Sequence, residues 1–287
     1  MLSIALYSRK YTEPQPFIDK LISSLSQRGN RLFLHTNILS KDSYVHFSDH
    51  ESLKECGKID FAVSIGGDGS FIDAANIVGD LNIPLVGINT GRIGFLSAIR
   101  KDDIEKCFDM LERGEYVLES RSLLHVDGSE DLNLNTQFIV NDITVRSTDS
   151  DSINAITIST GEQRINTYWA DGLIVATPTG STAYSMSCGG PILHPQTDVM
   201  VLTPIASHSL SVRPLVIPAD QPLRIDVDGR GGKYSLCVDT QRIIVDNSVS
   251  LFITKEKFSI STVLFKNNNF YSTIREKLLW GLDKRNN

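Results

Sequence analysis

The residues best suited to chemistry lie in a glycine-rich run that follows the apolar stretch 61–65. This run reads Gly66-Gly67-Asp68-Gly69-Ser70. Glycines let the backbone approach a phosphate group, and the N–H groups at the start of a helix attract anions. A carboxylate at such a place is unfavourable unless it binds a divalent metal ion or accepts a proton from an attacking hydroxyl. Asp68 is a candidate for these roles, and the alternative is that Asp68 only caps the following helix.

A second run with chemical potential spans residues 171–184. An apolar stretch, 173–176, leads into a turn that contains Pro178, Gly180 and three hydroxyl residues. Small, hydroxylated turns with glycine let a backbone come close to a polar ligand. Taken alone, this run is also compatible with a surface loop between two strands. Together with the glycine-rich run about a hundred residues earlier, it indicates an enzyme that handles nucleotides.

Two further polar segments are weaker candidates. The loop 89–96 carries Arg92 between two glycines, and Arg92 suits either a phosphate contact or a solvated turn. Asn141 and Asp142 end a strand-like run. Their amide and carboxylate groups can hydrogen-bond a ribose diol or the edge of an adenine, but without other evidence a polar β-turn is the better explanation of the pair.

The first 120 residues must position the glycine-rich run, and their pattern alternates between strands and helices. Strands are predicted at 2–7, 31–35, 61–65 and 85–88, and helices at 16–28, 71–78 and 102–113. Such alternation predicts an open α/β domain with a parallel sheet. Ligands of these sheets bind at the carboxyl ends of the strands, where the loops after 61–65 and 85–88 fall.

From about Tyr116 the pattern changes to short, β-branched, alternating segments. We expect an all-β domain that resembles a sandwich over 121–269, with one short helix at 183–189. A helix is predicted at 270–282 and is expected to pack back on the first domain or on a neighbouring subunit. The α/β domain is therefore expected to comprise 1–120 and 270–287.

Composition narrows the class of protein. The chain has 287 residues and a formal net charge of −6, which disfavours nonspecific binding to nucleic acids or to anionic membranes. The four cysteines have no metal-ligand spacing, which favours reduced thiols in the cytoplasm. No apolar run approaches the length of a membrane span, and the six histidines show no paired spacing for zinc.

Taken together, these segments resemble the NAD kinase family. The similarity runs in order through 66–70, 89–96, Asn141-Asp142, 171–192 and 202–214 to the ending 271–280. The Gly-Gly-Asp-Gly run is shared with lipid kinases and phosphofructokinases, whereas the run Thr177–Tyr184 is far more specific. The resemblance implies an α/β domain with a β domain that binds NAD. It also implies transfer of the γ-phosphate of ATP to the 2′-hydroxyl of the adenosine ribose of NAD, giving NADP.

The resemblance also implies roles for individual residues. Asp68 matches the catalytic aspartate, and the phosphate loop comprises Gly66, Gly67, Gly69 and Ser70. Residues expected to contact NAD are Asp68, Gly69, Asn141, Asp142, Asp171, Thr179, Thr182, Ala183, Tyr184, Ser185, Met186, Ser187 and Gln241. Among these, Tyr184 is expected to stack on a ring. A divalent metal, with Mg²⁺ the expected ion, and a cytoplasmic homodimer or homotetramer are further implications, although no dedicated metal site is evident from the sequence.

This chain departs from the family pattern at three places. Asp142 stands where the family commonly has Glu, Trp169 stands where many bacterial members have a basic residue, and Thr240 replaces a frequent Gly. Two other function classes compete with the NAD kinase interpretation. One is a lipid or sugar kinase with the same Gly-Gly-Asp-Gly run, and the other is a noncatalytic module that binds dinucleotides.

Overall fold

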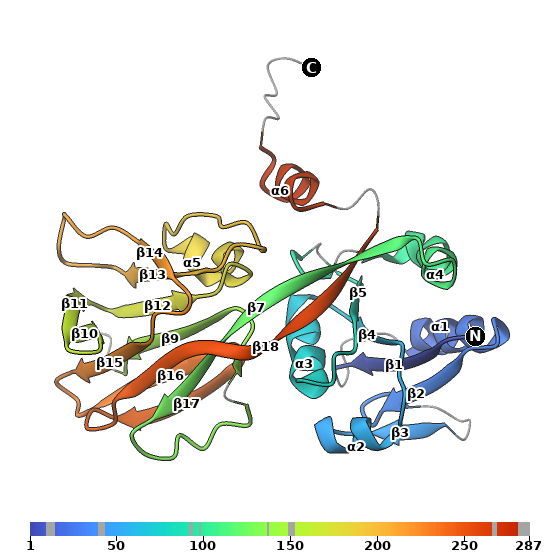
Figure 1. Ribbon diagram of the computed structural model, residues 1–287, viewed down its shortest axis with the longest axis horizontal. Helices are drawn as coiled ribbons and strands as arrows, with labels where there is room; N and C mark the ends of the chain where they lie inside the picture. The colour runs from blue at the N-terminus through green and yellow to red at the C-terminus, as the bar shows by residue number, and fades with distance from the viewer. Residues whose placement is uncertain are drawn as a thin grey trace. The chain divides into compact units, whose positions relative to one another are not determined.

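The computed structural model describes residues 1–9, 15–39, 44–91, 94–97, 99–136, 138–148, 153–265 and 269–280. The chain divides into two compact units: unit 1 is 1–120 with 260–287, and unit 2 is 121–259 (Figure 1). Strands β7 (Tyr116–Gly128) and β18 (Leu251–Phe265) each begin in one unit and end in the other. The second boundary therefore falls inside β18, whereas the sequence pattern places it at 269.

Unit 1 is built on a parallel sheet with the order β3-β2-β1-β4-β5, to which β6 and the end of β18 add beside β5. Its strands are β1 (Ser3–Ser8), β2 (Arg31–His35), β3 (Val45–Phe47), β4 (Phe61–Ile65), β5 (Leu85–Asn89) and β6 (Ile99–Arg100). Its helices are α1 (Gln15–Gln27), α2 (His50–Glu55), α3 (Asp68–Val78), α4 (Ile104–Glu112) and α6 (Phe270–Leu278). The chain leaves β1 toward β2 and leaves β4 toward β5, so the strand order reverses between β1 and β4. Ligands of open α/β sheets bind at such a reversal.

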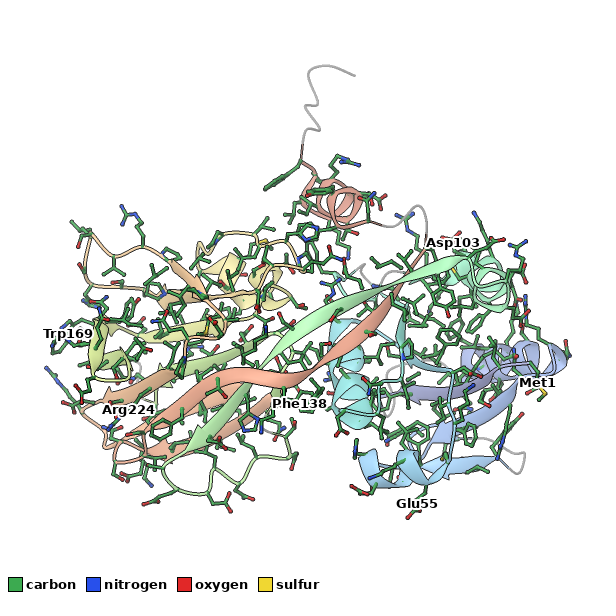
Figure 2. All side chains as sticks on the ribbon, viewed as in Figure 1. Met1, Glu55, Asp103, Phe138, Trp169 and Arg224 are labelled. Carbon is green, nitrogen blue, oxygen red and sulfur yellow. The ribbon has the colours of Figure 1, made fainter. Side chains whose placement is uncertain are left out.

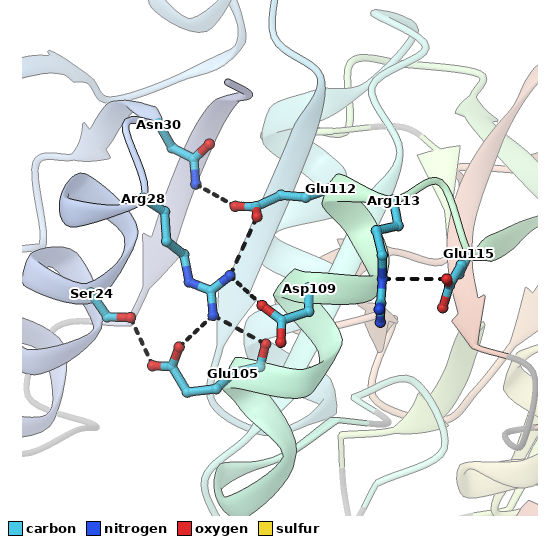
Figure 3. Close-up of polar contacts among 8 residues, drawn as sticks. All are labelled: Ser24, Arg28, Asn30, Glu105, Asp109, Glu112, Arg113 and Glu115. Carbon is cyan, nitrogen blue, oxygen red and sulfur yellow. Dashed lines mark hydrogen bonds and ion pairs between the residues drawn. The ribbon is translucent and has the colours of Figure 1, made fainter.

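Helices α1 and α4 pack on one face of this sheet. Ile18 and Leu21 of α1 share a buried cluster with Phe108 of α4 and with alternate residues of β1 and β4. Arg28, just beyond α1, joins the two helices: it donates to Glu105 and Asp109 at 2.7 and 2.6 Å, as Figure 3 shows. The apolar stripe and this ion-pair cluster together hold the two helices side by side.

Unit 2 consists of two antiparallel sheets. One has the order β14-β13-β12-β9-β16-β17, and the other joins β11, β10, β15, β18, β7 and β8. The remaining strands are β8 (Phe138–Ile139), β9 (Asp142–Ser147), β10 (Asn154–Thr160), β11 (Gln163–Ala170), β12 (Gly172–Ala176), β13 (Val199–Ile205), β14 (Leu215–Pro218), β15 (Leu223–Asp228), β16 (Lys233–Val238) and β17 (Gln241–Asp246). One buried cluster takes side chains from both sheets, among them Val175 and Ile156. The predicted sandwich-like β domain is confirmed.

Strand β12 is buried on both faces. Val175 faces the core between the sheets, whereas Ile174 and Ala176 join a second cluster with Val201. A 3₁₀ turn, Gly180–Thr182, and the short helix α5 (Tyr184–Ser187) follow β12 directly. Because both faces of the strand are buried, successive residues of 173–176 are all apolar instead of alternating with polar ones.

Several predicted elements differ from the structure. Helix α3 begins at Asp68 rather than at 71, and the predicted helix 102–113 is a 3₁₀ turn, Lys101–Asp103, followed by α4. The predicted helix 183–189 is shorter, and α6 ends at Leu278. The sequence pattern missed α2, a short segment of six residues whose N-terminus is set by a capping box between Asp49 and Ser52.

Candidate functional site

The carboxylate of Asp68 is held by the loop that follows β5. Its Oδ2 accepts a hydrogen bond from the N–H of Phe95 at 2.7 Å, and its Oδ1 accepts from Leu96 and Ser97 at 3.0 and 3.1 Å. Asp68 is the first residue of α3, and Gly67 is the N-cap without a side-chain hydrogen bond. The alternative interpretation of Asp68 as an N-cap is therefore wrong. The carboxylate instead points to the neighbouring strand's loop.

Close packing around Asp68 depends on a glycine of that loop. A Cβ at position 94 would lie 1.8 Å from Asp68 Oδ1. Only a residue without a side chain lets the backbone N–H groups of 95–97 reach the carboxylate. The sequence pattern marks Gly94 as part of a loop but does not reveal this contact. Arg92, in the same loop, lies outside the described residues.

The phosphate-loop residues lie where the strand order reverses. Gly66 directly follows β4 and donates its N–H to Ile88 O at 2.9 Å, and Ser70 is buried in α3. Arg9, just past the end of β1, donates to Gly69 O at 3.1 Å and to Asp73 Oδ1 at 2.9 Å. The structure thus adds a cation beside the loop that the sequence analysis missed, because no local signal links position 9 to position 69.

In unit 2, the backbone of Asn141 and Asp142 is held by Asp239. Asp239 Oδ1 accepts from the N–H groups of Asn141 and Asp142 at 2.7 and 3.1 Å, and its Oδ2 accepts from Val140 at 2.8 Å. Asp239 itself has a φ of 49° in the two-residue turn between β16 and β17. Its carboxylate holds the start of β9 in place, a role that the sequence pattern around Thr240 and Gln241 does not reveal.

Asp142 is a buried carboxyl group with an unusual proton affinity. It is only 9% exposed. Burial and, to a smaller extent, the charge of Asp239 raise the pKa of Asp142 to about 7, although a hydrogen bond from Thr144 opposes the shift. The same Thr144 hydroxyl donates to Asp142 Oδ1 at 3.1 Å. Near neutral pH this carboxyl group can therefore either donate or accept a hydrogen bond.

The hydroxyl-rich loop lies against Asn141. The Thr177 N–H donates to Asn141 O at 2.9 Å, and a Cβ at position 180 would lie 2.0 Å from the same oxygen. Among the described residues, the buried atoms Asn141 Oδ1 and Thr179 Oγ1 have no hydrogen-bond partner. Buried polar atoms are normally paired, so these two atoms are suited to a polar ligand.

The next candidates lie in helix α5 and in the two residues before it. Tyr184 is 36% exposed, and Thr182, Ala183, Met186 and Ser187 retain some exposure. The charges of Arg146 and Asp142 both act on the Tyr184 hydroxyl, whose pKa is raised mainly by burial. Ser185 is different: it is fully buried, and its hydroxyl shares a 2.8 Å hydrogen bond with Thr203. Ser185 therefore ties α5 to β13, and its side chain is not placed for a direct ligand contact.

The remaining candidates lie at the ends of strands in unit 2. Asp171 links β11 to β12 and is half-buried. Gln241 begins β17, and its Oε1 accepts a hydrogen bond of 2.9 Å from the N–H of Asn135. Trp169, on β11, is 58% exposed and lies at the edge of unit 2 in Figure 2. Together with Asp228 and Arg230 it lines a surface hollow of about 250 Å³. Trp169, which stands where many bacterial members of the family have a basic residue, thus lies on the surface of the strand that precedes Asp171.

Within the described ranges, no group of three or more His, Cys, Asp or Glu side chains is arranged to hold a metal ion. The described helices include none with the length and apolarity needed to cross a membrane.

Comparisons with known proteins agree with the geometry of both units. The ATP-NAD kinase N-terminal domain model matches residues 20–116, and the C-terminal domain model matches 140–254. A protein of Cytophaga hutchinsonii named NAD kinase is 38% identical, with 98% of this chain and 99% of the relative covered. A Flavobacterium psychrophilum protein of the same name is 37% identical, with 99% of this chain and all (100%) of the relative covered.

Solved structures show the same fold. Yeast NADH kinase, crystallised with NADH, superposes with a TM-score of 0.87 at 22% identity, with coverage of 99% of this chain and 89% of the yeast chain. An Archaeoglobus fulgidus NAD kinase in complex with ATP gives a TM-score of 0.74 at 23% identity, with coverage of 97% and 99%. Domain models for both halves and full-length relatives decide among the alternatives raised by the sequence: the chain belongs to the ATP-NAD kinase family.

Proposed function

We propose that the chain transfers the γ-phosphate of ATP to the 2′-hydroxyl of the adenosine ribose of NAD and so produces NADP, with Asp68 as the residue that receives the hydroxyl proton. ATP-dependent phosphorylation of NAD is the activity of the family to which the chain belongs. The observation that carries the assignment of Asp68 is the way its carboxylate is held.

The Asp68 carboxylate can accept one more hydrogen bond than the three it accepts from the backbone. A carboxylate has about four acceptor sites, and three are taken by the N–H groups of Phe95, Leu96 and Ser97. The remaining site, on Oδ2, is available to a substrate hydroxyl. A carboxylate that is already oriented loses little freedom when it accepts this hydrogen bond. General base catalysis of this kind contributes on the order of 10²–10⁴-fold in rate.

We assign the binding of NAD mainly to unit 2. The unpaired Asn141 Oδ1 and Thr179 Oγ1 support polar contacts with the dinucleotide, and the exposed ring of Tyr184 suits stacking. Residues proposed to contact NAD are Asp68, Gly69, Asn141, Asp142, Asp171, Thr179, Thr182, Ala183, Tyr184, Met186, Ser187 and Gln241. For Ser185 we propose a positioning role through Thr203 instead.

We propose that the triphosphate of ATP binds at Gly66, Gly67, Gly69 and Ser70. A divalent ion such as Mg²⁺ would neutralise phosphate charge, as in other phosphoryl transfers. The described residues do not form a dedicated metal site, so we assign the ion to the nucleotide rather than to a protein cage. The family resemblance is also the ground for proposing a cytoplasmic homodimer or homotetramer, and light scattering of the purified chain measures its mass.

The decisive experiment measures NADP formation by the purified chain with NAD, ATP and Mg²⁺. We expect product only when all three are present, and a loss of at least about 10²-fold in D68N. Asp80, an exposed carboxylate of the same unit, provides the matched control D80N, which should keep wild-type activity. Equal thermal melting of the variants shows that the fold is retained. Turnover near the wild-type value in D68N would refute the role of Asp68, and a wild type that makes no NADP would refute the proposed activity.

A further inference from the structure

Helix α6 places Lys277 beside the loop that holds Asp68. Lys277 Nζ lies 4.6 Å from the centroid of the Phe95 ring, and the Phe95 N–H donates to Asp68 Oδ2 at 2.7 Å. The helix is fastened to unit 1 by the buried Ile274 and by an ion pair of 3.1 Å between Glu276 and Arg100. Its N-terminus is set by a capping box formed by Asn269. The position of Lys277 is therefore held from several sides.

The charge of Lys277 is poorly compensated in this position. Burial lowers the pKa of Lys277 to about 8, and the carboxylates of Asp68 and Glu276 only partly oppose that shift. Among the residues that the structure describes, none forms an ion pair with Lys277 Nζ, and the ammonium group lies over the face of the Phe95 ring. A lysine with a purely structural role usually extends its ammonium group into water. A half-buried ammonium group of this kind would be stabilised by a bound anion.

We propose that Lys277 is a catalytic residue that binds the phosphate chain of ATP beside Asp68. This inference rests on the proposed function, because it assigns a residue to the same phosphoryl transfer. In that transfer the 2′-oxygen of NAD bonds to the γ-phosphorus, the bond from this phosphorus to the bridging oxygen breaks, and ADP leaves with its electron pair. The hydroxyl proton passes to Asp68.

A cation is needed at this point for an electrostatic reason. Asp68 and the phosphate chain are both negative, so each raises the cost of bringing the other close. An ammonium group near both the carboxylate and the phosphate chain lowers that cost. Arg9 cannot serve in the same way without giving up its hydrogen bonds to Asp73 and to Gly69 O. Lys277 has no such hydrogen bonds among the described residues.

The first test measures steady-state kinetics of NADP formation by K277M. The matched control is R275M, which removes a charge from the exposed side of the same helix. Loss of a charge-assisted hydrogen bond to bound ATP should raise the KM for ATP by about ten- to a hundredfold. We expect the KM for NAD to stay within about twofold of wild type. R275M should behave as wild type, and all three proteins should melt at similar temperatures.

The second test follows protons during ATP binding to the full chain without NAD. A bound phosphate raises the pKa of Lys277, so the wild type should take up protons near pH 8, where the unliganded group titrates. Calorimetry in buffers of different ionisation enthalpy measures this uptake, and K277M should lack it. Above pH 8 the affinity of the wild type for ATP should fall because the free amine is neutral.

The outcomes separate the two proposals. A wild type that forms NADP, together with a K277M variant of unchanged KM for ATP and unchanged proton uptake, overturns the role of Lys277 alone. A K277M variant with a lower kcat but normal ATP binding also overturns it, because Lys277 would then act through Asp68 and not on phosphate. A wild type without NADP formation overturns the proposed function itself.

Discussion

Gly94 and Asp68 fit together so closely that a Cβ at position 94 would lie 1.8 Å from Asp68 Oδ1. Gly94 lies in the loop after β5, whereas Asp68 is the first residue of α3. The contact explains how three successive N–H groups, those of 95–97, reach one carboxylate. The orientation of the candidate base thus depends on the absence of a side chain elsewhere in the chain.

Replacing this glycine should remove activity without unfolding the chain. In G94A the added methyl group displaces the Asp68 carboxylate or the loop, and a misplacement of about 1 Å at a reacting group costs on the order of 10² in rate. NADP formation measures the loss. G91A is the matched control, because a Cβ at position 91 meets no atom within 4 Å. Equal activities of G94A and G91A would contradict the importance of this fit.

A second prediction concerns Asp239, which holds the backbone at Asn141. In D239N the amide nitrogen cannot accept a hydrogen bond, so at least one N–H among residues 140–142 loses its acceptor. We expect the free energy of unfolding to fall by about 1–3 kcal/mol and the KM for NAD to rise more than that for ATP. Asn tolerates the positive φ of this position, so D239N should not add backbone strain to the measured loss of stability.

Urea denaturation and steady-state kinetics measure these two effects. D228N is the control, since Asp228 is an exposed carboxylate of the same unit. Surface substitutions of this kind usually change stability by no more than about 0.5 kcal/mol. If D239N and D228N have the same stability and the same KM for NAD, then Asp239 does not organise this part of the site.

Local sequence patterns predicted most of the strands and helices that carry the candidate site. The features that these patterns missed depend on contacts between residues far apart in the sequence. The buried strand 61–65 and the strand–loop–helix junction after it could be predicted because apolar periodicity and glycine spacing are local. The start of α3 was misplaced, since the small polar residues 68–70 have weak helix preferences and are helical here because α3 packs on the sheet. The roles of Gly94 and Asp239 depend on partners far away in the sequence, which no window of the chain contains.

A third prediction tests the ion-pair cluster that joins α1 to α4. Arg28 is only 20% exposed and contacts Glu105, Asp109 and Glu112 (Figure 3). R28M leaves these three carboxylates near one another without a cation, so we expect a loss of about 1–2 kcal/mol in unfolding free energy. R113M is the control: Arg113 is 60% exposed and pairs only with Glu115 among the described residues. An exposed pair contributes about 0–1 kcal/mol, so equal losses in the two variants would refute the cluster's contribution.

The last prediction follows from the buried carboxyl group of Asp142. Its pKa is about 7 in the folded chain against 3.8 for an ordinary aspartate, so the folded state binds more protons than the unfolded state between these values. The stability associated with Asp142 is therefore fully present below about pH 4 and is lost as the pH rises to about 7, by at most about 1.4 kcal/mol per pH unit. The main cause is burial, and the negative charge of Asp239 adds to it.

The comparison of wild type with D142N isolates this contribution. The amide keeps nearly the same shape and does not titrate, so we expect the stability of D142N relative to wild type to increase as the pH rises from about 4 to about 7 and to level off above that range. Urea denaturation at a series of pH values measures the difference. Because Asp228 is exposed, D228N should follow the wild-type pH profile. A constant difference between wild type and D142N over this range would mean that the Asp142 carboxylate is stabilised in the fold by neighbours that outweigh its burial.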